Sequence, residues 1–137
     1  MVDRELLAKG VADIRDAVSR IREVLPTDVV VFERDRTTRE VVVLNLFVAL
    51  QACLSLATHW LADEGLAVPA SYRDVFRVLG ERSVLPADLA DRLALAAGLR
   101  NLIAHRYGVL DWRRIHAVAA ADLDDLHAFC SALAQRA

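Results

Sequence analysis

The feature that most restricts how this chain can fold is an apolar run between residues 40 and 64. Few polar side chains interrupt it, namely those of Asn45, Gln51, Ser55, Thr58 and His59. A helix that is apolar almost all round must be buried on several sides, so we expect the central helix of a bundle or of a dimer. It is not predicted to span a membrane, because polar residues recur within it and charged segments flank it closely. Gly65 predicts its C-terminal end.

Four further helices are predicted from hydrophobic periodicity and from helix-end signals. The first covers about residues 2 to 25, with apolar side chains at steps of three and four, and it ends before Pro26. A short helix begins after Pro69 and ends at Gly80, and another begins at Pro86. The last runs from Asp111, as its N-cap, to about residue 134.

The connection over residues 26 to 36 contains the apolar run Val-Val-Val-Phe at residues 29 to 32. We expect a packed loop there, because the sequence offers no second strand with which a strand could pair. The Thr-x-x-Glu pattern at residues 37 to 40 has the form of a capping box and predicts the start of the central helix.

Together these elements predict one all-α domain over residues 1–137, a bundle of about five helices. The hydrophobic content of 55% lies above the usual range for a globular domain, so we expect an apolar face that pairs with a second copy of the chain. Cys53 and Cys130 are predicted to be small buried hydrophobes in a reducing compartment. The charged N-terminus has no secretory apolar segment, and a cytoplasmic protein is expected.

Charge and motif content exclude several classes of function. The net charge is only -2, so the chain is no polycation and any contact with RNA must be local. Arg73, Arg77 and Arg82 are candidates for a phosphate-binding patch or, alternatively, for a solvated helix edge. Zinc or di-iron spacings, glycine-rich phosphate loops and nucleophile elbows are absent, so neither a metal nor a cofactor is predicted.

Functional side chains are concentrated between residues 98 and 108, where Arg100, Asn101, His105 and Tyr107 occur within eight positions. On an ideal helix Arg100 and Tyr107 project about 20° apart, whereas Arg100 and His105 differ by about 140°. Asn101 and His105 form an i,i+4 pair, which allows the amide to hold the imidazole tautomer. Arg100 and His105 converge through the long arginine side chain, through unwinding of the last turn, or across a two-fold axis.

Arg100 and His105 supply the groups needed to cleave RNA without a metal ion. The imidazole of His105 suits general acid–base catalysis, and the permanent charge of Arg100 suits a phosphate whose negative charge grows during the reaction. Asn101 either orients His105 or binds phosphate. For Arg106 we expect only a favourable interaction with the helix dipole.

The pattern Arg100-x4-His105-x-Tyr107, with Asn101 after the arginine, resembles the signature of the HepT family, the toxins of HepT/MntA toxin–antitoxin pairs within the HEPN superfamily of helical ribonucleases. Similar segments at residues 49–53, 71–73 and 110–112 extend the resemblance over nearly the whole chain.

The resemblance implies a symmetric homodimer and a metal-independent endoribonuclease toxin in which Arg100 and His105 are catalytic. It also implies a partner, an MntA-like minimal nucleotidyltransferase antitoxin that transfers AMP from ATP to Tyr107 and that assembles with the toxin into larger hetero-oligomers.

Two other classes of function remain open at this point. One is a non-catalytic helical module that binds a nucleotidyltransferase or a nucleotide, and the other is an unrelated bundle that carries the motif by chance. The joint presence of Arg100, Asn101, His105 and Tyr107 favours the nuclease, because a pure adaptor would not require all four.

Overall fold

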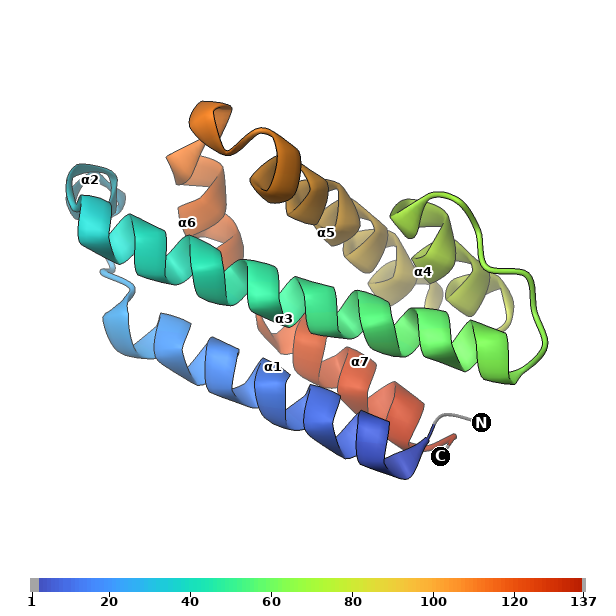
Figure 1. Ribbon diagram of the computed structural model, residues 1–137. Coiled ribbons are helices and arrows are strands. Elements are labelled where there is room, and N and C mark those ends of the chain that lie inside the picture. The colour runs from blue at the N-terminus through green and yellow to red at the C-terminus, as the bar shows by residue number, and fades with distance from the viewer. Residues whose placement is uncertain (1–2, 137) are drawn as a thin grey trace.

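The computed structural model describes residues 3–136, and the regular structure in this range is entirely helical (Figure 1). This confirms the predicted all-α class, although the number of helices differs from the five expected. Residues 3–136 form seven α-helices and one short 3-10 helix: α1 (Arg4–Val24), α2 (Val29–Arg34), α3 (Arg36–Asp63), α4 (Tyr72–Glu81), α5 (Ala87–His105), η1 (Tyr107–Val109), α6 (Trp112–Ala121) and α7 (Asp124–Ala134).

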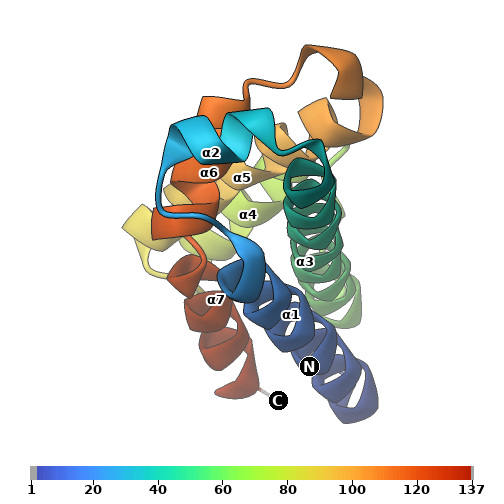
Figure 2. The ribbon, with the colours of Figure 1, turned by 90° about the vertical axis from the view of Figure 1, so that its left-hand side faces the viewer.

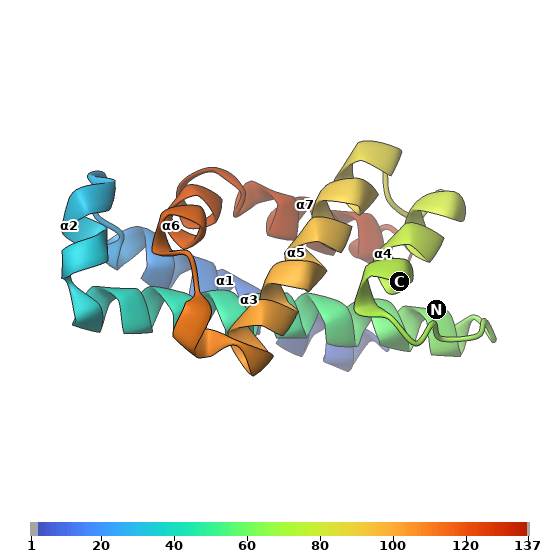
Figure 3. The ribbon, with the colours of Figure 1, turned by 90° about the horizontal axis from the view of Figure 1, so that it is seen from above.

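The central position predicted for the apolar run is confirmed, because α3 contacts each of the other six α-helices of the described chain. It runs beside α1 on one side, while α5 crosses it obliquely on the other (Figure 3). Leu46, Ala57 and Leu61 of α3 are completely buried. By length and composition α3 is apolar enough to cross a membrane, but half of that apolar stretch is buried within the bundle, as in the core helix of a soluble protein.

The capping box at residues 37 to 40 is not formed, because Asp35 caps α3 two residues earlier. Its carboxylate accepts hydrogen bonds from the Thr38 hydroxyl at 2.7 Å and from the Thr38 backbone N–H at 3.1 Å. These bonds also lower the pKa of the Asp35 carboxyl. Glu40 instead pairs with Arg36 one turn before it, at 2.7 Å.

The prediction of a loop over residues 26 to 36 is wrong, because most of this segment forms α2. Asp28 caps this helix by accepting a hydrogen bond from the Val30 backbone N–H at 2.8 Å. Phe32 is fully buried and packs against Trp112 and His116 of α6. The apolar run therefore packs against the core as expected, but it does so from a short helix instead of a loop. Figure 2 shows α2 and α6 together at this end of the bundle.

The last predicted helix is divided into α6 and α7 at residues 122 and 123. Asp124 and Asp125 lie in the first turn of α7, where acidic side chains interact favourably with the helix dipole. The two side chains therefore favour the start of a new helix here over the continuation of α6. Arg92 of α5 binds both Asp125 oxygens at 3.0 and 3.1 Å, and Arg22 of α1 binds Asp124 at 2.7 Å. These contacts hold the start of α7 against two neighbouring helices.

The first helix begins at Arg4 rather than at residue 2, which lies outside the described residues. Cys53 and Cys130 are buried free thiols, which confirms their predicted role as small hydrophobes. Burial raises the pKa of the Cys53 thiol well above its usual value and raises the pKa of Cys130 to about 11. Neither thiol is therefore ionised near neutral pH, and neither is suited to nucleophilic chemistry.

Candidate functional site

The guanidinium of Arg100 is held in place by three side chains of two neighbouring helices, α3 and α4. Arg100 Nε donates a hydrogen bond to Gln51 Oε1 of α3 at 2.9 Å. Its Cζ lies 5.3 Å from the ring centroid of Phe47 on α3 and 5.0 Å from that of Tyr72 on α4. These distances are those of cation–π contacts. The side chain therefore has a defined position while its charge stays unpaired, since no carboxylate lies within ion-pair distance of it between residues 3 and 136.

Asn101 supports Arg100 and does not contact His105. Its Oδ1 accepts a hydrogen bond from Arg100 Nη1 at 3.1 Å, and within the described chain it has no hydrogen bond to the imidazole. The i,i+4 contact that the helical spacing allows is thus not formed. The guanidinium competes successfully for the amide oxygen, because a hydrogen bond from a charged donor is stronger than one from a neutral ring.

His105 is the last residue of α5, and its side chain is exposed. In the part of the chain that the structure describes, its ring makes no hydrogen bond and no ion pair. His116 differs, because its Nε2 lies 2.8 Å from the Pro26 carbonyl oxygen and its ring packs on Phe32. The imidazole of His105 is therefore free to meet a ligand or a second subunit, and no hydrogen bond within the chain joins it to Arg100.

Tyr107 lies beyond the end of α5, which changes the expected geometry. Arg106 leaves the helical region with φ −136° and ψ 40°, and Tyr107 begins the 3-10 turn η1. The prediction that Arg100 and Tyr107 share one helical face therefore fails, because the wheel does not extend past His105. The Tyr107 ring packs edge-on against Trp112 with 6.0 Å between centroids, and 46% of the residue stays exposed.

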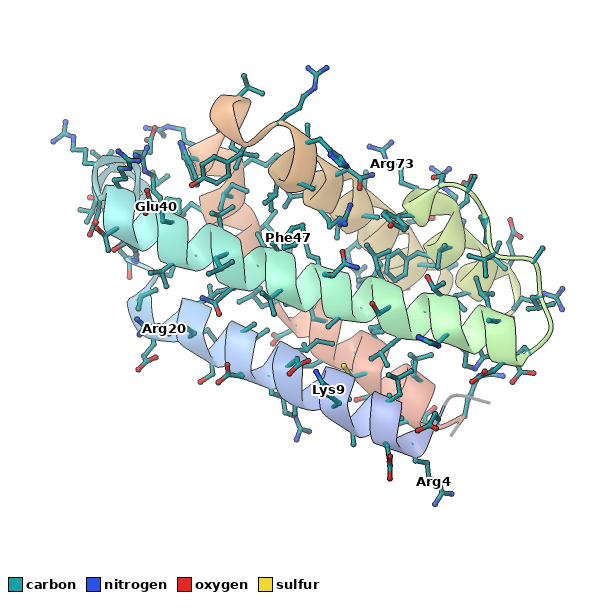
Figure 4. The ribbon with its side chains drawn as sticks, viewed as in Figure 1. Arg4, Lys9, Arg20, Glu40, Phe47 and Arg73 are labelled. Atoms are coloured by element: carbon teal, nitrogen blue, oxygen red, sulfur yellow. The ribbon has the colours of Figure 1, made fainter. Side chains whose placement is uncertain are left out.

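A groove between α3 and α5 connects the surroundings of Arg100 with Tyr107. Its volume is about 320 Å³, and it is lined by Glu40, Val43, Leu44, Phe47, Ile103, Ala104 and Tyr107. Phe47, which Figure 4 shows between α3 and α5, stacks on Arg100 at one end of the groove, and Tyr107 closes the other end. Phe47 contacts Arg100 and Ala104 precedes His105, so this apolar groove lies directly beside the residues of the motif.

A second hollow of about 220 Å³ lies on the other side of Tyr107 and is basic. It is lined by Arg36, Arg39, Glu40, Tyr107, Gly108 and Trp112. The Arg39 guanidinium stacks on Trp112 at 4.9 Å, and its buried Nε has no hydrogen-bond partner. Tyr107 thus projects between an apolar groove and a basic hollow. Residues 3 to 136 contain no group of three or more histidine, cysteine or acidic side chains that could hold a metal ion.

Sequence reasoning missed three residues that contact Arg100, namely Gln51, Phe47 and Tyr72. A polar amide inside an otherwise apolar helix was a usable signal, because a partly buried amide needs a hydrogen-bond partner. The identity of that partner was not predictable, since Arg100 lies 49 residues further along the chain.

Comparison with solved structures shows that the fold of this chain is the one found in a class of helical toxins. The Shewanella oneidensis HEPN toxin, solved tri-AMPylated and in complex with an MNT antitoxin, superposes with a TM-score of 0.88 at 28% identity over 97% of this chain and 99% of that chain. YutE from Bacillus subtilis, a cytosolic protein, superposes with a TM-score of 0.85 over 98% of this chain and 90% of its own length. Its identity is 16%, so this likeness shows the fold alone.

Sequence comparison gives the family. The model of the ribonuclease HepT-like family matches residues 14–133. The mRNA nuclease HepT of Shewanella oneidensis is 30% identical over 125 residues, which cover 91% of this chain and 93% of that protein. The chain therefore belongs to the ribonuclease HepT-like family.

We predict that Gln51→Leu lowers the free energy of unfolding by about 1 to 2 kcal/mol, because Arg100 then loses the acceptor of its half-buried Nε–H. Urea unfolding measures the change. The matched control is Ser55→Leu, one turn further along α3 at an exposed position, where little change is expected. In an Arg100→Met background the Gln51 substitution should cost much less. Equal losses in both backgrounds would show that the hydrogen bond contributes nothing.

Proposed function

We propose that this protein is the toxin of a HepT/MntA-type pair, a cytoplasmic, metal-independent endoribonuclease that a nucleotidyltransferase antitoxin inactivates. The observation that carries the proposal is an arginine fixed in position yet unpaired, five residues from an exposed histidine, in a chain of the ribonuclease HepT-like family. A fixed guanidinium without a carboxylate partner is suited to an anionic ligand, and the phosphodiester of RNA is such a ligand.

In the proposed reaction His105 and Arg100 divide the work between proton transfer and charge stabilisation. The neutral imidazole of His105 takes the proton of the ribose 2′-hydroxyl while the O2′–P bond forms. The P–O5′ bond breaks, and the 5′ oxygen receives a proton from water or from an imidazolium. The products are a 2′,3′-cyclic phosphate and a 5′-hydroxyl. Arg100 stabilises the negative charge that grows on the phosphoryl oxygens, and Asn101 and Gln51 hold Arg100 in place.

A homodimer completes this site in our proposal. Arg100 is fixed between α3 and α4, whereas His105 ends α5 without a partner in the described chain, so a second subunit is a direct way to bring a histidine to an arginine. The face that supports this is apolar: Leu44 is 62% exposed and Val48 is 40% exposed, one turn apart on α3 beside the groove. Burial of such side chains favours association.

Tyr107 is the proposed site of adenylylation. Its phenol is half-exposed at the start of η1, so the tyrosyl oxygen is accessible to attack the α-phosphate of ATP, with release of pyrophosphate. The relative from Shewanella oneidensis is described as tri-AMPylated and bound to an MNT antitoxin. A bulky anionic group two residues from His105 would exclude RNA by occupancy and by charge repulsion.

A non-catalytic module that binds a nucleotidyltransferase is the second candidate function. It is favoured by one observation, that neither a hydrogen bond nor an ion pair orients His105 within the described chain. The two candidates differ in whether the purified protein cleaves RNA.

We predict that Arg100→Ala and His105→Ala each lower the rate of RNA cleavage at least about 100-fold, because each removes a group that acts in the transition state. The assay follows fluorescent single-stranded RNA with EDTA present and with antitoxin absent. Arg106→Ala is the matched control, and a change of only a few-fold is expected there. Cleavage by His105→Ala at the parental rate would remove the proposed role of His105. No cleavage by the parent protein would support the non-catalytic module.

We predict that co-expression with the cognate antitoxin adds whole AMP units to Tyr107, visible by intact-mass spectrometry. Tyr107→Phe should abolish the additions, because the acceptor oxygen is then absent. The chain has two tyrosines, so Tyr72→Phe is the matched control and should keep them. Protein that is fully neutralised but unmodified would show that binding of the antitoxin suffices for inhibition.

We predict that Leu44→Glu turns the dimer into a monomer in light scattering at micromolar concentration, because a charge buried in the apolar face is costly. Leu95→Glu is the matched control, because Leu95 on α5 is 63% exposed, about the same as Leu44, yet does not line the groove. Dimers of unchanged stability in both variants would place the interface elsewhere.

A further inference from the structure

The structure separates the three arginines of the predicted phosphate-binding patch. Arg77 pairs with Asp74 at 3.3 Å. Arg82 lies after the last turn of α4, in a hollow that it shares with Trp60 and Arg136. Arg73 makes neither a hydrogen bond nor an ion pair in the range 3–136, yet its side chain lies beside α5 (Figure 4). Within the described residues, Arg73 is the one of the three whose guanidinium has no ion-pair partner and lies against α5.

Gly98 of α5 provides the space in which the Arg73 guanidinium lies. A Cβ atom placed on Gly98 would be 2.5 Å from Arg73 Nη2, 3.1 Å from Nε and 3.2 Å from Cζ. The planar guanidinium therefore lies across the α5 backbone, in the volume that any other residue at position 98 would fill. Glycine is among the least favourable residues in a helix interior, so the space is obtained at the expense of helix propensity.

Arg73 and Arg100 both lie where α4 packs against α5. Gly98 precedes Arg100 by two residues, which is about 3 Å along the helix axis and about 200° around it, so the closeness of the two arginines rests on α4. Tyr72, the neighbour of Arg73 in the first turn of α4, stacks on the Arg100 guanidinium at 5.0 Å. Within the described residues no carboxylate lies within ion-pair distance of either arginine. Two neighbouring like charges without a carboxylate partner in the described residues form a site for an anion that spans both.

We propose that Arg73 binds a phosphate of single-stranded RNA adjacent to the phosphate at Arg100. This inference rests on the proposed ribonuclease function and extends its substrate site from one phosphate to two. Guanidinium groups pair bidentately with phosphates and with carboxylates alike, so the neighbouring side chain decides between RNA and a protein partner. Tyr72, which is 38% exposed, adds an aromatic surface of the kind on which single-stranded nucleic acids are bound, and this favours single-stranded RNA.

The test measures binding of a fluorescent single-stranded RNA to the full chain at several salt concentrations. It uses a His105→Ala background so that the RNA stays intact. Arg73→Gln should weaken binding about ten-fold and should reduce the slope of log affinity against log salt concentration by about 0.7, the contribution of one phosphate contact. Arg77→Gln, on the same helix and with the same change of charge, is the matched control and should change the slope much less.

Gly98→Ala tests the same site with Arg73 still present. The added methyl group displaces the end of a flexible side chain and no backbone, so the variant should fold and should unfold at an equal or higher urea concentration. Its affinity for RNA should nevertheless fall about as far as that of Arg73→Gln. A variant that is more stable yet binds RNA less well is not explained by damage to the fold.

Several outcomes would overturn the inference. Unchanged affinity and salt slope in Arg73→Gln, or equal losses in Arg77→Gln, would show that Arg73 contacts no phosphate. Normal RNA binding combined with weaker antitoxin binding would assign Arg73 to a protein interface. If the parent protein cleaves RNA while Arg73→Gln binds it normally, only this inference fails. If the parent protein neither cleaves nor binds RNA, the proposed function fails and this inference fails with it.

Discussion

The burial of α3 is the constraint on which the rest of the structure depends. A helix that is apolar on nearly every side cannot remain exposed to water, and the other six α-helices of the described chain each cover part of it. Val42, Leu46 and Ala49 have no exposed surface. Because α3 contacts every other α-helix, the position of each of them relative to the candidate site is set through α3.

The polar and partly exposed positions of α3 are the ones that build the site. Asn45 satisfies its amide locally, by donating to the Val41 carbonyl oxygen at 2.8 Å. Gln51 instead accepts from Arg100 on α5, and Phe47 stacks on the same guanidinium. The helix that organises the core therefore also positions the one cation that the motif and the geometry both single out. Loss of Gln51 would release Arg100 without opening the core.

The sequence predicts well those features that depend on local periodicity, and less well those that depend on contacts between distant segments. The central helix and the cap at Asp111 follow from local pattern, and the structure confirms them. α2 was missed because its six residues are too few for a helical period to be visible beside a β-branched run. The break between α6 and α7 depends on Arg92 and Arg22, which lie far away in the sequence.

In the candidate site, too, local spacing predicts some features and misses those that depend on where a helix ends. The motif residues are found from their spacing, but an ideal wheel assumes that α5 continues to Tyr107, and Arg106 ends it first. This early end has a functional consequence. Among residues 3–136 the Tyr107 ring packs edge-on against Trp112 and stays half-exposed outside the core, so a group added to its oxygen need not disturb the packing of α3 or the position of Arg100. In the proposed toxin, adenylylation of Tyr107 on a turn beyond the end of α5 would inactivate the protein while it stays folded.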